Sequence, residues 1–426
     1  MGSAPFPSPL AARLSDDVLQ RFLRYVRIDT QAQEGATTYP STSKQLDLSR
    51  LLVSELTEIG LDDIELTEHG CVFATLPGND GAPVIGLIAH VDTTPDSPGT
   101  DVVPIVHEDY AGGVIALPGD PSQVIDPAEE LALAARVGHD IVTSDGTTLL
   151  GADDKAGVAE IMAAVAHLVD APEPRATVRV AFTADEEVGR GTDHFDLEKF
   201  GAEAAYTLDG SGLGELEIET FSAFQVRVTF RGRGAHPGSA KGKLVNALKL
   251  AADFVVSLPR DSLSPETTDG RQGFIHPSRI SGGVEETTVV LIVRDHDDTL
   301  LDEHTALLRG LAEAIGVREP RARVTVEVQE TYRNMRPVID RHPRVIAAAE
   351  EAIRRAGVEP VRSLIRGGTD GARLSAMGLP TPNLFTGGQN YHSTREWASV
   401  QDMAAAAATV VELVRVWGEP EARTSG

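Results

Sequence analysis

The longest apolar runs in this chain have the length of single β-strands, and this restricts its fold more than any other feature. Val84–Ala89 and Thr288–Val293 are the clearest examples, and neither approaches the roughly 18 apolar residues that cross a bilayer. Strand-sized runs alternate with segments of helical periodicity, which is typical of an α/β fold. We therefore predict a mixed, mostly parallel sheet flanked by helices.

The periodicity predicts where the elements of this fold begin and end. Residues 1–15 are expected to form a loose leader, and the first helix to begin at Ser15, whose side chain can cap it. The other helices are expected over 43–59, 157–168 and 343–355 and from Ser399, and the strands over 84–89, 177–182 and 204–208.

The pattern changes after about residue 215. Apolar and polar residues alternate from Phe224 to Phe230, as in a strand with one face in solvent. The elements that follow have the order strand, helix, strand, strand, helix, strand, which fits a small ferredoxin-like α+β domain. We therefore expect an inserted domain at 218–331, and a discontinuous catalytic domain made of 1–217 and 332–426.

Charge and cysteine content exclude several classes of function. Lys and Arg number 38 against 64 Asp and Glu, for a formal net charge of −26. Such a chain is repelled by nucleic acid phosphates and anionic membranes, so neither is expected as a partner. The single cysteine, Cys71, excludes an internal disulfide and a Cys-rich zinc site. The N-terminus lacks the pattern of a secretory signal, and a cytoplasmic location is expected.

Acids and histidines gather in five short segments. IAHVDTTPD follows a predicted strand and places His90 and Asp92 two residues apart, so that in extended chain both face one side. The others are LLGADDKAG, FTADEEVGRG, TLDGSG and FTGGQNYHSTREW. Each has an ordinary explanation by itself: a helix N-terminus, a solvated acidic loop, a turn, or a surface histidine.

Taken together, the five segments favour a metal site. In open α/β sheets, ligands bind beyond the carboxyl ends of the strands, where most of these segments are expected. Histidine and carboxylate donors suit zinc, and also manganese or cobalt. There are enough acids to hold two ions with one carboxylate shared between them, an arrangement found in hydrolases.

These motifs resemble those of the co-catalytic di-zinc exopeptidases, a family that includes carboxypeptidase G and aminoacylase. HVD, GADDKAG, DEEVG and the late histidine carry the family resemblance. SDGTTLLGADDKAG, HEDYAGG, AHPGSAKGKLVNA and IRGGTDGARLSAMGLPTPNLF are most similar to its tripeptide aminopeptidase branch. The resemblance covers nearly the whole chain, and it implies hydrolysis of the first peptide bond of a tripeptide.

The resemblance also implies a role for each site residue. His90 and Asp209 would bind one zinc ion, Glu187 and His392 the other, and Asp153 would bridge both, with a cis peptide bond after it. Asp92 would orient the His90 ring. Glu186 would act as general base and acid toward a metal-activated water.

Two residues outside the metal ligands are implied in substrate binding. His236 would meet the oxyanion, and Arg366 would clamp the substrate carboxylate; Asn334 and Arg294 are weaker candidates. The inserted domain would serve as a lid or for homodimerisation. The alternatives are a relative that acts as a dipeptidase, carboxypeptidase or N-acyl amino acid hydrolase, and an acidic protein that binds metal or peptide without turnover.

Overall fold

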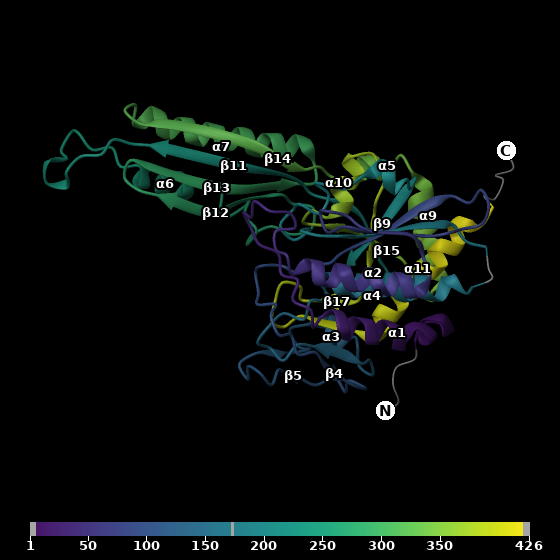
Figure 1. Ribbon diagram of the computed structural model, residues 1–426. Helices are drawn as coiled ribbons and strands as arrows, with labels where there is room; N and C mark the ends of the chain where they lie inside the picture. Colours follow the sequence, from purple (N-terminus) through teal and green to yellow (C-terminus); the bar gives the residue numbers. More distant parts are fainter. Residues whose placement is uncertain (1–5, 172–173, 421–426) are drawn as a thin grey trace. The chain divides into compact units, whose positions relative to one another are not determined.

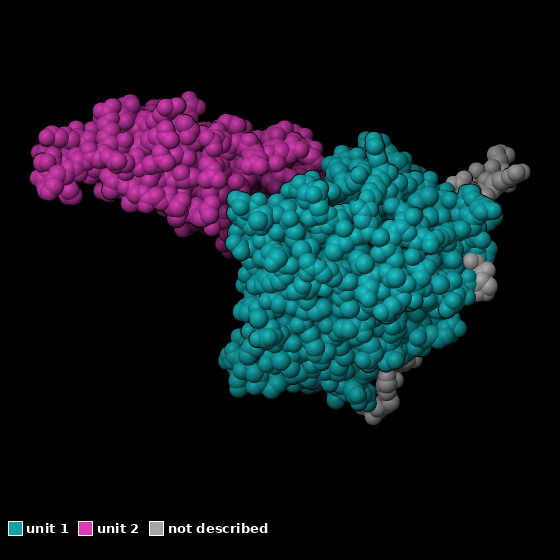
Figure 2. Space-filling view, viewed as in Figure 1, with its two compact units in different colours: residues 1–218, 337–363, 369–426 teal, residues 219–336, 364–368 magenta. Residues whose placement is uncertain are grey.

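The computed structural model describes residues 6–171 and 174–420, which form two compact units (Figure 2). Unit 1 comprises residues 1–218, 337–363 and 369–426, and unit 2 comprises 219–336 and 364–368. The expected inserted domain, 218–331, differs from unit 2 by a few residues at its ends and lacks the short segment 364–368. In the described part of the chain, no helix is both long enough and apolar enough to cross a membrane.

Unit 1 is built on an eight-stranded sheet with the strand order β1-β2-β8-β3-β9-β16-β10-β15. The four central strands, β8, β3, β9 and β16, pair in parallel, whereas β1, β2 and β10 pair antiparallel. The sheet is therefore mixed, as expected, with its parallel part in the centre. The strands are β1 (Asp62–Leu66), β2 (Val72–Leu76), β3 (Val84–His90), β8 (Thr177–Thr183), β9 (Ala204–Gly210), β10 (Glu215–Thr220), β15 (Val361–Ile365) and β16 (Asn383–Phe385).

Helices cover both faces of this sheet (Figure 1). On one face α4 packs on β3 and β9, α2 packs on β1 and β2, and α1 and α11 pack against α4. On the other face, residues of α5, α10 and nearby loops pack on apolar side chains of β2, β3, β8 and β9. The helices are α1 (Pro9–Tyr25), α2 (Gln45–Ile59), α4 (Ala152–Val169), α5 (Leu197–Phe200), α8 (Arg336–Ile339), α9 (Pro343–Arg355), α10 (Asp370–Ala376) and α11 (Val400–Gly418).

The predicted start of the first helix is wrong. Helix α1 begins at Pro9, and the Ser8 hydroxyl caps it by accepting from the Ala11 amide at 3.1 Å. A serine cap followed by proline at the first helical position is a strong start signal, and it precedes Ser15, which lies inside the helix. Residues 1–5 of the expected leader lie outside the described residues.

Other helix ends lie where the capping residues predict them. Helix α2 ends before Gly60, which has the left-handed conformation with φ 92°. The Ser399 side chain caps α11 by accepting from the Asp402 amide. Helix α4, by contrast, begins at Ala152 and so includes the adjacent acids, although Asp153 and Asp154 have non-helical backbone angles.

Two smaller sheets of unit 1 were not expected from the sequence. One has the strand order β17-β18-β7-β4 and the other pairs β5 with β6. Their strands are too short to show a periodicity in the sequence. The first sheet joins distant parts of the chain, because it pairs the residues around Trp397 with those around Val142. The strands are β4 (Ile105–His107), β5 (Ile115–Ala116), β6 (Val124–Ile125), β7 (Ile141–Thr143), β17 (Gly388–Gln389) and β18 (Trp397–Ser399), and the short helix α3 is Leu131–Ala134.

Unit 2 has the predicted ferredoxin-like order of elements. Its antiparallel sheet has the order β12-β13-β11-β14, and α6 and α7 pack on it over one apolar core. The elements are β11 (Ser222–Arg231), the 3₁₀ turn η1 (Pro237–Ser239), α6 (Ala247–Val256), β12 (Phe274–Gly282), β13 (Glu286–Asp295), α7 (Asp298–Arg318) and β14 (Arg323–Tyr332).

Helix α4 lies so close to strand β9 that residue 157 has no room for a side chain. A Cβ atom on Gly157 would lie 2.0 Å from the Leu208 carbonyl oxygen and 2.4 Å from an Asp154 carboxylate oxygen. Strand β9 carries Asp209, so its backbone could make room for a side chain at residue 157 only by moving that site residue. The glycine therefore sets the spacing between two elements that carry site residues.

We predict that Gly157→Ala destabilises the protein by about 1–3 kcal/mol, the usual cost of overpacking. The matched control is Gly310→Ala in helix α7, where an added Cβ would meet nothing within 4 Å. That change should stabilise its helix by up to about 1 kcal/mol. The measurement is the melting temperature of both variants, and a Gly157→Ala protein that melts at or above the wild-type temperature would contradict the packing argument.

Candidate metal centre

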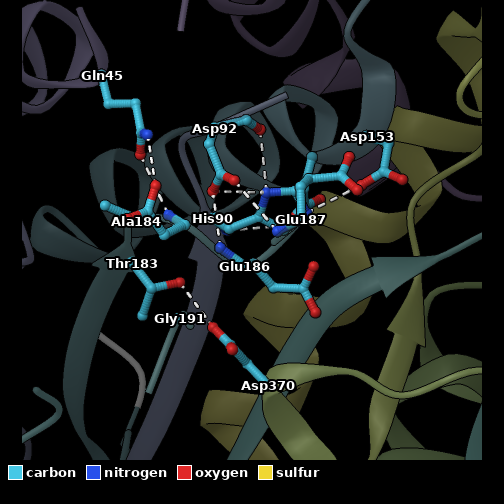
Figure 3. A network of polar contacts seen from close by, with 12 residues as sticks. Gln45, His90, Asp92, Asp153, Thr183, Ala184, Glu186, Glu187, Gly191 and Asp370 are labelled. Atoms are coloured by element: carbon cyan, nitrogen blue, oxygen red, sulfur yellow. Dashed lines mark hydrogen bonds and ion pairs between the residues drawn. The ribbon is translucent and has the colours of Figure 1, made fainter. Parts of the chain in front are cut away.

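The acids and histidines of the five motifs meet at the carboxyl ends of the central parallel strands. Figure 3 shows those of the first three motifs, namely His90, Asp92, Asp153, Glu186 and Glu187. His90 is the last residue of β3, and Asp209 lies near the end of β9. Glu186 and Glu187 follow β8, which pairs in parallel with β3. Because parallel strands present their carboxyl ends at one edge, residues distant in sequence come together there.

Two groups of side chains could each hold a metal ion, and they share one residue. The first is His90, Asp153 and Asp209, and the second is Asp153, Glu187 and His392. Within each group the candidate ligand atoms all lie within 4.8 Å of one another. The structure thus brings together the five predicted ligands, with Asp153 between the two groups.

In both groups the histidine Nε2 atom lies close to two carboxylates. His90 Nε2 lies 2.9 Å from Asp153 Oδ1 and 3.6 Å from Asp209 Oδ1. His392 Nε2 lies 3.0 Å from Glu187 Oε2 and 3.4 Å from Asp153 Oδ2. The two carboxylate oxygens of Asp153 therefore face different histidines, which is the arrangement that a bridging ligand requires.

Glu396 holds the turn that carries Asp153. Its buried carboxylate accepts hydrogen bonds from the amides of Leu150, Gly151 and Asp153, at 2.8, 2.7 and 3.0 Å. The Asp153–Asp154 peptide bond is cis, as the resemblance implies. Sequence analysis missed Glu396, because its only signal is its presence in the same loop as His392.

Asp92 contacts both the His90 ring and the loop that carries Glu186 and Glu187. Its main-chain oxygen lies 3.0 Å from His90 Nδ1, and its Oδ1 lies 3.4 Å from the same nitrogen. Its two carboxylate oxygens accept from the amides of Glu186 and Glu187, each at 3.1 Å. A proton on Nδ1 that is directed toward Asp92 leaves Nε2 free to face a cation.

The loop around His392 is fixed by main-chain and side-chain contacts within unit 1. The Ser97 hydroxyl donates to the His392 carbonyl oxygen at 2.7 Å, and the Tyr391 hydroxyl donates to the Gly210 carbonyl oxygen at 2.9 Å. Asp96 Oδ2 lies 3.4 Å from His392 Nδ1. A carboxylate oxygen thus lies 3.4 Å from Nδ1 in both histidines, from Asp96 in His392 and from Asp92 in His90. The contact of Asp96 was not predicted from the sequence.

Burial makes two acids of this centre, Asp209 and Glu187, hard to ionise. It raises the pKa of Asp209 to about 7 and that of Glu187 to about 8, and in both cases the nearby Asp153 adds to the effect. Burial opposes protonation of both histidines. Hydrogen bonds to Asp153 nevertheless hold the pKa of His90 well above its usual value and that of His392 at about 11.

The donor set fits divalent cations. Glu187 Oε1 is buried and has no hydrogen-bond partner among the described residues, which is unfavourable for a carboxylate oxygen. A cation would pair with this oxygen and would relieve the repulsion among the crowded carboxylates. Two imidazoles with three carboxylates are a nitrogen and oxygen donor set that zinc accepts.

Glu186 belongs to neither ligand group. Its amide is held by Asp92, and burial raises the pKa of its carboxyl group well above the usual value. A carboxylate that lies beside the ligands without being one of them suits the transfer of protons.

His236 and Arg366 belong to unit 2, and their roles toward substrate stay predictions. His236 is exposed, and its Nδ1 accepts from the Gly238 amide at 3.2 Å. The Arg366 guanidinium donates to oxygens of Thr268, Gly270 and Gln272. The Arg366 guanidinium therefore binds the loop 268–272 of its own unit.

The two weaker candidates also lie in unit 2. Arg294 donates to the Arg366 carbonyl oxygen at 3.2 Å, and its buried Nε has no partner among the described residues. Asn334 donates to Glu219 and to the His296 carbonyl oxygen.

Comparison with known proteins identifies the family of this chain. The family model described as Peptidase family M20/M25/M40 matches residues 143–416. The chain belongs to this family. It is 45% identical over 407 residues to Peptidase T of Geobacillus thermodenitrificans, a match that covers 95% of this chain and 99% of the relative. It is 46% identical over 404 residues to Peptidase T of Pectobacterium carotovorum, with 94% and 98% covered.

Solved structures show the same fold. A tripeptidase from Staphylococcus aureus superposes with a TM-score of 0.76 at 22% identity, covering 95% of this chain and 98% of the other. The aminopeptidase PepT from Bacillus cereus gives 0.71 at 23% identity, covering 95% and 99%. A dinuclear metal-binding M20 peptidase from Bacillus subtilis gives 0.65 at 14% identity, covering 95% and 98%.

These findings confirm the resemblance and the predicted fold class. The chain is an M20 peptidase that is similar over nearly its full length to Peptidase T. Family membership and the two ligand groups together support metal-dependent peptide hydrolysis.

The position of Asp153 in both candidate ligand groups gives a direct prediction. Asp153→Ala should remove both metal ions together, since each ligand group would keep only two residues. The measurement is metal content per chain by mass spectrometry after dialysis, with circular dichroism to verify folding. The control is Asp170→Ala, at the exposed far end of the same helix, which should keep the wild-type content. Retention of two full equivalents by Asp153→Ala would exclude the bridge.

Proposed function

We propose that this protein is a zinc-dependent aminopeptidase that releases the N-terminal residue of tripeptides. The observation that carries the proposal is the pair of ligand groups joined by Asp153, with Glu186 beside them. The extended similarity to Peptidase T supports the choice of a tripeptide substrate.

In this proposal, the ligands of the two zinc ions are those implied by the resemblance. His90 and Asp209 would hold one ion, Glu187 and His392 would hold the other, and Asp153 would be shared by both. Zinc ions bound there would polarise the scissile carbonyl group and lower the pKa of a water molecule. Manganese and cobalt accept the same kinds of donor atom, so they are expected substitutes.

Glu186 moves the proton in this reaction. Its raised pKa suits a carboxylate that takes a proton from water as the water oxygen attacks the carbonyl carbon of the scissile bond. The same group then returns the proton to the leaving amine. Asp92 fixes the backbone of Glu186 and the tautomer of His90, so it orients both without reacting.

The roles that we propose for residues of unit 2 are predictions from the sequence. His236 would stabilise the oxyanion, and Arg366 would bind the substrate carboxylate. The sequence also predicts a cytoplasmic enzyme and a homodimer formed through residues 218–331. The net charge of −26 argues against nucleic acids and anionic membranes as partners.

Substrate length and the free amine distinguish this function from its alternatives. We expect hydrolysis of Ala-Ala-Ala, little hydrolysis of Ala-Ala or N-acetyl-Ala-Ala-Ala, and complete loss of activity with a chelator. Amine release is measured for the three peptides at equal concentration. Cleavage of the dipeptide or the acetylated peptide would instead indicate a dipeptidase or an N-acyl amino acid hydrolase. Absence of any turnover with added zinc would favour a binding protein.

Removal of the proton carrier should separate metal binding from catalysis. We predict that Glu186→Ala keeps both metal ions and loses at least about 100-fold in kcat, since general acid–base catalysis contributes about 10²–10⁴-fold. The measurement pairs metal analysis with single-substrate kinetics. Loss of metal from this variant would mean that Glu186 is a ligand and that the proton is moved by another group.

A further inference from the structure

Asp185 is the first acid of the DEE motif, and the metal centre gives it no role. It is fully buried, and it belongs to neither ligand group. Its backbone is left-handed with φ 65°, a conformation that residues other than glycine adopt uncommonly. Such a conformation persists only when the surrounding contacts fix it.

Gln45 makes the contacts that fix residue 185. Its side-chain Nε2 donates to Asp185 Oδ1 at 2.7 Å, and its Oε1 accepts from the Asp185 amide at 3.1 Å. A primary amide is both donor and acceptor, so one side chain binds both the carboxylate and the backbone of its partner. Gln45 is buried, and it is the first residue of helix α2. Its backbone is therefore held in a regular element.

Neighbours of Gln45 complete the contact with Asp185. The Ser41 amide donates to Asp185 Oδ2 at 2.6 Å, and the Ser41 hydroxyl donates to Oδ1. The Tyr39 hydroxyl lies 3.0 Å from the Ala184 carbonyl oxygen and 3.1 Å from that of Arg190. The segment from Tyr39 to Gln45 thus holds both ends of the loop 184–190.

Asp92 holds the middle of the same loop. Its two carboxylate oxygens accept the consecutive amides of Glu186 and Glu187. Asp185 directly precedes these two amides, and its left-handed backbone makes the turn that leads the chain into them. Figure 3 shows Gln45 and Asp92 reaching this loop from different directions.

We propose that Gln45 is a positioning residue for Glu186 and Glu187. By clamping Asp185 it fixes the turn that directs one carboxylate to proton transfer and the other to the metal centre. The proposal rests on the proposed function for the roles of the two glutamates, but the clamp itself is a property of the loop. The proposal gives a function to Gln45, the last residue of the segment PSTSKQ, which lies outside the five motifs of the metal centre.

A charge exchange between the two partners tests the clamp. Gln45→Glu places two carboxylates face to face, and Asp185→Asn removes the acceptor that Gln45 Nε2 needs. The double variant restores a complementary pair, because the carboxylate at 45 can accept from both the amide side chain and the backbone NH of residue 185. We expect each single variant to lose about 10–100-fold in kcat, the usual effect of removing a contact that orients a metal site.

Recovery of kcat in the double variant distinguishes the clamp from a general loss of stability, which a second substitution would not reverse. KM should stay within about twofold in all variants, and the double variant should regain most of the lost kcat. Gln33→Glu is the matched control, because it is the same change at an exposed position outside the segment from Tyr39 to Gln45, and it should keep wild-type kinetics. Wild-type kcat in Gln45→Glu, or a double variant no better than the single ones, would overturn the proposal.

Hydrogen exchange of the amides of residues 184–190 gives a readout that needs no activity. Exchange should accelerate in both single variants and return toward wild-type rates in the double variant, whereas unchanged rates in the single variants would overturn the clamp. If the wild-type chain cleaves no peptide, the proposed function fails while this measurement still decides the clamp. If Gln45→Glu does not fold, Gln45→Met removes both hydrogen bonds without adding charge. It should show the same accelerated exchange, and wild-type rates in it would overturn the proposal.

Discussion

The structure depends on the gathering of buried carboxylates around Asp153. Isolated buried charges are costly, so such a cluster is stable only with cations or protons among its members. Two histidines supply part of that positive charge, while burial and the nearby Asp153 raise the pKa of Asp209 and Glu187, an effect that a bound cation would oppose. The metal ions of the proposed function would satisfy this demand, and the chemistry of the site follows from the same electrostatic requirement.

A second set of carboxylates supports the first. Glu396 binds the amides of the Asp153 turn, Asp92 binds the amides of the DEE loop, and Asp185 binds the segment from Ser41 to Gln45. Each of these acids accepts backbone hydrogen bonds, so each fixes a main-chain turn. The acids that hold the turns are therefore different residues from the acids to which we assign roles in the reaction, although both kinds lie in the same motifs. This division accounts for more carboxylates than two metal ions would require.

Sequence analysis could predict the parts of this arrangement that follow from periodicity and local motifs. Strand β3 and helix α11 were predictable because apolar runs and capping residues are local signals. The start of α1 was mistaken because Ser15 offered a plausible cap and Ser8 a better one. Glu396 and Gln45 act on loops that are distant in sequence, so the sequence alone gave no sign of their partners. The small sheet around Trp397 was missed for the same reason, because its strands are short and pair over long range.

The most direct test of the central claim is anomalous X-ray diffraction from crystals grown with zinc. We expect two zinc peaks, one between His90 and Asp209 and one between Glu187 and His392. Both should lie about 2.0–2.2 Å from oxygens of Asp153, the usual distance for zinc and carboxylate. A single peak, or two peaks of which one does not contact Asp153, would contradict a bridged pair of ions and with it the proposed chemistry.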